Sequence, residues 1–119
     1  MKNRIIVLAL LLATIVSCKK ETTPEVVTDK NETPIEKLIS GNKRFIDEKT
    51  IHPHQNKKTV LANQDAQHPF AVVLTCSDSR VSPEILFDQG IGDLFVIRNA
   101  GNLISDIDMG SIEYAVEHL

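Results

Sequence analysis

The sequence predicts an α/β fold: a partial parallel sheet with an N-terminal helical arm. Two apolar runs of strand length, Phe70–Thr75 and Leu94–Ile97, are each followed by a polar loop and then by a helix-forming segment. This order is typical of parallel strands joined by right-handed crossovers. Because two parallel strands cannot cover their own faces, we expect residues 33–119 to be the N-terminal part of a larger domain, truncated before its remaining strands.

The N-terminus has the pattern of an export signal. Lys2 and Arg4 precede an apolar run over residues 5–16, too short to span a bilayer core of about 30 Å as a helix. Ser17, a small residue, then stands directly before Cys18, which resembles the cleavage site of bacterial lipoproteins. We predict a lipoprotein-type signal peptide over 1–17 and lipidation of Cys18. An ordinary secretory signal or an uncleaved anchor is the alternative.

Residues 18–32 are polar and lack apolar periodicity, as in a flexible tether. With Cys18 acylated, the protein would be exported and anchored to a membrane, on the periplasmic or cell-surface side. The net charge is −3, and no basic run extends beyond Lys57 and Lys58, so nucleic acid is not an expected partner.

A helix of about fourteen residues is predicted to begin after Thr33. Thr33 and Glu36 form a capping box, and Pro34 suits the first helical position. Gly41 interrupts the helix at a cost of up to about 1 kcal/mol relative to Ala. One face is apolar, and we expect it to pack against a core or a second subunit; it comprises Ile35, Leu38, Ile39, Phe45 and Ile46.

Weaker signals fill the middle of the chain. Ile51–His54 reads as a loop whose histidines, His52 and His54, are expected to be solvated rather than metal-bound. Lys57–Gln67 has weak helical character and is stopped by the Pro that follows His68.

After the first strand, Ser82 is predicted to cap a short helix that runs through Phe87, and 89–93 form a turn. Arg98–Asn102 reads as a loop in which Gly101 permits a positive φ. The last helix begins near Asp106 or Asp108.

Cys76–Arg80 is the stretch that favours chemistry. It follows a predicted buried strand, where active sites of open α/β sheets collect. Arg80 can hold Asp78 ionised and oriented, and Cys76 could be a nucleophile or a metal ligand. The alternative is a structural cysteine followed by a turn with a surface ion pair.

From Ile35 to Leu119 the sequence resembles the β-class carbonic anhydrases. The matching segments, in order, are Gly41–Phe45, Cys76–Val81, Gly92–Asn102 and Ser111–Leu119. The resemblance implies a zinc enzyme that reversibly hydrates CO2 to bicarbonate, a dimer or multiple of dimers when full length.

By matching position, the resemblance makes Cys76 the first zinc ligand. It makes Asp78 and Arg80 a catalytic pair that orients the zinc hydroxide, and it allows Asp78 to bind the metal itself in a closed state. Gln67 and Phe95 correspond to positions that line the CO2 pocket in some members, partly across a dimer interface.

The chain departs from the family at the other zinc ligands, which come from a later H-x-x-C segment that these 119 residues do not contain. We therefore expect the chain as given to be inactive alone. A non-catalytic truncated remnant that acts as a binding or assembly module is the alternative. A Cys-phosphatase or rhodanese-like enzyme fits poorly, since its loop is C-x5-R and Asp78 would repel phosphate.

Overall fold

A computed structural model describes residues 31–119. The predicted signal peptide (1–17), Cys18 and nearly all of the predicted tether (18–32) lie outside the described residues. Within 31–119, no helix is long and apolar enough to cross a membrane. The elements in chain order are α1 (Pro34–Ile46), α2 (Lys57–Ala62), β1 (Ala71–Cys76), α3 (Pro83–Leu86), β2 (Leu94–Asn99), the 3₁₀ turn η1 (Ala100–Asn102) and α4 (Asp106–His118).

Strands β1 and β2 form a two-stranded parallel sheet, in register from Ala71 opposite Leu94 to Cys76 opposite Asn99. The predicted α/β class with a partial parallel sheet is confirmed. The predicted end of the second strand is wrong by two residues, because Arg98 and Asn99 continue the ladder instead of opening a loop.

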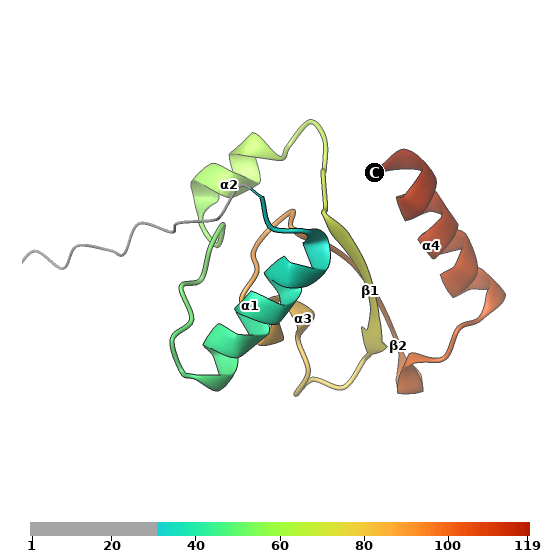
Figure 1. Ribbon diagram of the computed structural model, residues 1–119. Coiled ribbons are helices and arrows are strands. Elements are labelled where there is room, and N and C mark those ends of the chain that lie inside the picture. Colours follow the sequence, from blue (N-terminus) through green and yellow to red (C-terminus); the bar gives the residue numbers. More distant parts are fainter. Residues whose placement is uncertain (1–30) are drawn as a thin grey trace, which may run out of the picture.

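Helices lie on both sides of this sheet. Figure 1 shows α1, α2 and α3 on one side and α4 on the other. The contact with α4 includes Tyr114, whose ring centroid is 6.3 Å from that of Phe95 in β2. Ile97 and Ala115 are buried, but Val72 remains 37% exposed, so the predicted burial of the strands is incomplete in the described residues.

The start of α1 matches the prediction. The Thr33 side chain accepts a hydrogen bond from the backbone N–H of Glu36, and the Glu36 carboxylate accepts one from the Thr33 backbone at 2.8 Å. This reciprocal cap satisfies backbone donors that the first helical turn leaves free.

The face of α1 that contacts α3 is not the predicted apolar face. Gly41 is buried against the Phe87 carbonyl, and the Asn42 side-chain amide donates to the Leu86 carbonyl at 2.9 Å. The three isoleucines of the apolar face are 61 to 69% exposed: Ile35, Ile39 and Ile46. These three side chains do not pack against the core of residues 31–119, so packing of this face against a second subunit stays a prediction.

A buried ion pair ties α1 to the segment after α3. Asp88 is 1% exposed, and its carboxylate accepts hydrogen bonds from Arg44 Nε at 2.5 Å and from the backbone N–H groups of Ile51 and His52. Burial alone would raise the pKa of Asp88, but these donors together hold it below its usual value.

Two smaller differences and one agreement concern helix ends. The predicted helix over 57–67 ends as α2 at Ala62. Ser82 precedes α3 but makes no side-chain cap, because its hydroxyl donates to the Glu84 carboxylate at 3.0 Å. Helix α4 begins at Asp106, one of the two predicted starts, and is capped by Ser105.

Candidate functional site

The candidate site lies at the carboxyl edge of the sheet. Cys76 is the last residue of β1 and stands opposite Asn99, the last residue of β2. The Ser77 backbone N–H donates to the Asn99 carbonyl at 2.8 Å, which fixes the start of the loop that leaves β1. Both strands thus deliver their following loops to one edge, where ligand sites of open α/β sheets lie.

The Cys76 thiol is surrounded by backbone donors. Its Sγ lies 3.4 Å from the backbone nitrogen of Asp78. Hydrogen bonds from the backbone N–H groups of Asp78 and then Gly101 lower the pKa of Cys76 below its usual value. Gly101 reaches this position in η1 with φ of 76°, so the predicted positive φ is confirmed.

Asp78 and Arg80 form a two-point ion pair. Arg80 Nε lies 2.9 Å from Asp78 Oδ1, and Arg80 Nη2 lies 2.6 Å from Oδ2. The Arg80 backbone N–H also donates to Oδ1 at 2.9 Å. These bonds lower the pKa of Asp78 to about 2 and raise that of Arg80, so the carboxylate is ionised and its direction is fixed.

Arg98 is a site residue that the sequence alone did not single out. It extends from β2 across the end of β1 and donates to the backbone carbonyls of Cys76, Asp78 and Val81. Its position in what was expected to be a loop concealed this function. Its place in the sequence could have identified it, because an arginine near the end of one strand can reach the Cys76–Arg80 loop at the end of the neighbouring strand.

Asn99 has one satisfied and one unsatisfied side-chain atom. Its Nδ2 donates to the Leu103 carbonyl at 2.6 Å and so holds the loop after η1. Its Oδ1 is buried without a hydrogen-bond partner among the described residues. Buried acceptors normally have a hydrogen-bond donor, and residues 31–119 supply none to the Asn99 Oδ1 atom, which lies beside Cys76 in the ladder.

The side chains that could bind a metal at this site are of types that zinc prefers, but there are only two of them among the described residues. A thiolate-forming Cys76 and an ionised Asp78 are both established zinc ligand types. No group of three or more potential metal-binding side chains occurs within residues 31–119. The described chain therefore fits a zinc site only in part.

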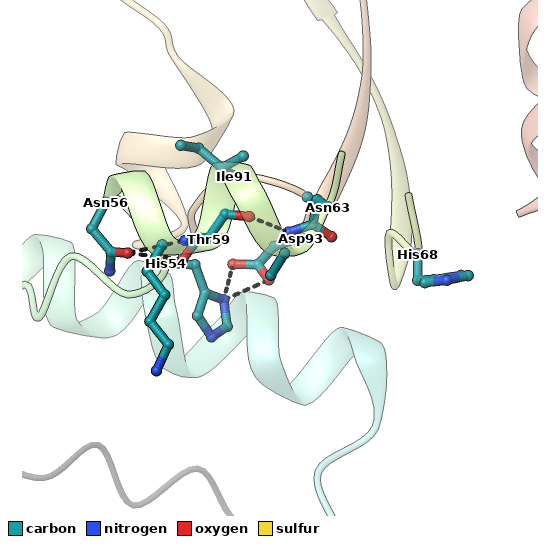
Figure 2. A pocket seen from close by; sticks show the side chains of 10 residues that line it. His54, Asn56, Thr59, Asn63, His68, Ile91 and Asp93 are labelled. Carbon is teal, nitrogen blue, oxygen red and sulfur yellow. Dashed lines mark hydrogen bonds and ion pairs between the residues drawn. The ribbon is translucent and has the colours of Figure 1, made fainter. Parts of the chain in front are cut away.

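The histidines do not complete this set. His54 and Asp93 line a separate hollow near the opposite edge of the sheet, with His54 Nδ1 2.8 Å from Asp93 Oδ1 (Figure 2). His68 lines the same hollow but points away from that pair in Figure 2. His52 contacts Thr50, and His118 stacks on a tyrosine, so each lies in surroundings of its own.

Gln67 and Phe95 lie away from Cys76 within this chain. Gln67 is exposed in the segment before β1, and Phe95 pairs with Val72, four residues before Cys76 along the strand. At about 3.3 Å per residue, Val72 and Cys76 are separated by roughly 13 Å along the strand. Their predicted place in a substrate pocket, partly across a dimer interface, stays a prediction.

Comparison with known proteins gives this geometry a context. Residues 71–119 match the family model described as "Carbonic anhydrase". The chain is 52% identical over 79 residues to the carbonic anhydrase of Mycolicibacterium smegmatis, which covers 66% of this chain and 38% of that protein. It is 50% identical over 59 residues to beta carbonic anhydrase 1 of Caenorhabditis briggsae, which covers 45% of this chain and 22% of that protein.

A solved structure of the beta-carbonic anhydrase CcaA is 33% identical in sequence, with a TM-score of 0.48 over 69% of this chain and 41% of that chain. The sequence matches support membership of the carbonic anhydrases. The relative named beta carbonic anhydrase 1 supports the β class among them. The chain spans about two-fifths or less of the length of these relatives, so their activity is a proposal for this protein.

Proposed function

We propose that this chain contributes to the zinc-dependent, reversible hydration of CO2 to bicarbonate. The observation that carries the proposal is the placement of the Cys76 thiol beside the Asp78–Arg80 pair at the carboxyl edge of a parallel sheet. The names of two relatives, a carbonic anhydrase and a beta carbonic anhydrase, support it.

Zinc, when bound, would act as a Lewis acid that lowers the pKa of a water molecule to about 7 and so provides hydroxide near neutral pH. Cys76 would hold the metal through its thiolate. Asp78 would accept a hydrogen bond from the attacking oxygen nucleophile and so orient it toward the carbon of CO2, and the product of its addition would be bicarbonate.

Arg80 has a supporting function in this mechanism. Because its guanidinium binds both carboxylate oxygens of Asp78, that group stays an acceptor and keeps one orientation. The same ion pair also determines whether Asp78 can bind the metal itself. If Arg80 released Asp78, the carboxylate would be free to bind the metal and close the site.

Two donor side chains, Cys76 and Asp78, do not form a catalytic zinc site, which takes three protein ligands and an open position. We therefore propose that the 119 residues alone are inactive and that the histidine and second cysteine ligands belong to the full-length form. A non-catalytic binding or assembly module is the competing function.

The experiment is a stopped-flow CO2 hydration assay with a pH indicator, on the zinc-loaded full-length protein and on the 119-residue chain. We expect turnover from the former and none above buffer from the latter. Asp78→Asn should lower the full-length rate at least about 100-fold, the low end of the loss when a preorganised hydrogen-bonding group of an active site is removed. Asp47→Asn, a change at an exposed pair with Lys43, is the matched control. A full-length protein that binds zinc without turnover would instead support the binding module.

We also propose that the full-length form is a homodimer or a multiple of dimers. The exposed apolar face of α1, with Ile35, Ile39 and Ile46, supports this proposal. Gln67 and Phe95 would then line the CO2 pocket across the interface. Sedimentation of the full-length protein tests the assembly, and a monomer at micromolar concentration would contradict it.

Finally, we propose export and membrane anchoring through a lipid on Cys18. The sequence pattern of residues 1–18 supports this proposal. Metabolic labelling with a radioactive fatty acid should mark the protein and fail on Cys18→Ala. Equal labelling of both would rule the anchor out.

A further inference from the structure

We propose that Arg98 is a positioning residue that holds the Cys76–Val81 loop in the conformation that brings Cys76 and Asp78 together. The proposal rests on the proposed function in treating this loop as part of a zinc site. The geometric part stands on three hydrogen bonds that one guanidinium donates to one loop.

The three bonds reach the beginning, the middle and the end of the loop. Arg98 Nε lies 3.1 Å from the Cys76 carbonyl oxygen, and Nη2 lies 2.6 Å from that of Asp78 and 3.0 Å from that of Val81. The Asp78 carbonyl also accepts the Val81 N–H at 3.2 Å, so the guanidinium closes on a turn that is already formed.

Other contacts of the loop do not replace this function. The Asp78–Arg80 pair lies inside the loop, so it shapes the loop without fixing it to the sheet. Ser77 is tied to the end of β2 through its backbone N–H, but it anchors only the first residue after the strand. Arg98 is therefore the side chain that connects the rest of the described loop to β2.

The shape of the guanidinium matters more than its charge. The Arg98 side chain is exposed, so its Coulomb interactions are screened by water. Arginine presents donors in a rigid planar fork, whereas lysine has one compact ammonium group on a flexible stem. Arg98→Lys keeps the positive charge but cannot donate to three carbonyls in the same way. This variant therefore distinguishes the effect of the hydrogen bonds from the effect of the charge.

The first measurement is amide hydrogen exchange on the metal-free full-length protein. In Arg98→Lys and in Arg98→Ala, we expect protection of the Arg80 and Val81 amides to fall at least about 10-fold, as expected when hydrogen bonds worth about 1.4 kcal/mol are lost. The interior β1 amides of Val73 and Leu74 should keep their protection.

The second measurement is Zn²⁺ affinity, from competition with a chromophoric chelator. Loss of groups that orient metal ligands costs about 10- to 100-fold in affinity, and we expect a loss in that range for both Arg98 variants. Arg44→Lys is the matched control, because Arg44 also pins a loop but binds Asp88 instead of this loop. It should lower global stability and leave zinc affinity unchanged.

Each outcome decides the proposal. Wild-type exchange or wild-type affinity in Arg98→Lys would overturn it. A loss of affinity in Arg44→Lys equal to that in Arg98→Lys would also overturn it, since general destabilisation would then be the cause. If the wild-type protein bound no zinc, the proposed function would fail, while the exchange data would still decide whether Arg98 holds the loop.

Discussion

Gly41 and Phe87 approach so closely that the helix backbone of α1 rests on the carbonyl group that follows α3. A Cβ added at Gly41 would overlap that carbonyl oxygen. The glycine that sequence reasoning treats as a weak point of α1 is thus the residue that lets α1 and α3 meet. The contact also places Arg44 within reach of Asp88.

Gly41→Ala should therefore destabilise the protein in spite of the higher helix propensity of alanine. Overpacking of this kind typically costs about 1–3 kcal/mol. Urea denaturation followed by circular dichroism measures the change. Gly110→Ala is the control: Gly110 lies in α4, and within residues 31–119 the added Cβ would meet no atom within 4 Å beyond its chain neighbours and its own helix backbone. Alanine there should stabilise by up to about 1 kcal/mol. Equal effects at both glycines would contradict the close contact.

Loss of the Asp88 charge should be strongly destabilising. Asp88→Asn keeps the shape of the side chain but leaves Arg44 without its carboxylate, and breaking such a buried pair costs about 3–5 kcal/mol. The free energy of unfolding in urea is the measurement. Asp47→Asn, at an exposed pair, should change it little. A small effect at Asp88 would show that water replaces the pair without cost.

The Asp78–Arg80 pair predicts that the stability of the folded protein falls at acid pH. The pKa of Asp78 falls from its usual 3.8 to about 2 because Arg80 donates to its carboxylate. The folded pKa is the lower one, so the stabilisation is present above about pH 4 and is lost as the pH falls toward 2. A ¹³C NMR titration of the Asp78 carboxyl in the metal-free protein should show this midpoint. In Arg80→Ala it should return toward 3.8.

The Cys76 thiol should ionise below its usual range in the metal-free protein. The backbone N–H groups of Asp78 and Gly101 favour the thiolate and lower its pKa. Alkylation by iodoacetamide in a Cys18→Ser background, measured against pH, should give a midpoint below 9.0, the usual value for this group. In concentrated urea the midpoint should return to that value. An unchanged midpoint on unfolding would contradict the donor arrangement.

Local features were predictable from the sequence because they depend on neighbouring residues. Thr33 and Glu36 sit three positions apart, and the reciprocal cap follows from that spacing. Asp78 and Arg80 pair across two positions in the same way. The strand around Val73 was recognisable from its β-branched apolar run.

The errors and omissions concern contacts between distant segments. Arg98 meets the Cys76 carbonyl 22 residues away, and Arg44 meets Asp88 44 residues away. Neither separation carries a periodic signal. The exposed isoleucines of α1 show a related limit, since a helical apolar face predicts burial without naming its partner.

The shared register of β1 and β2 also restricts how this chain can vary in length. Side chains alternate between faces along a strand, so a single-residue insertion in Ala71–Cys76 would turn Cys76 toward the opposite face. The same change in Leu94–Asn99 would move Arg98 off the loop that it binds. Insertions should therefore be tolerated only in the connecting segments, and both strands of related chains should keep their length.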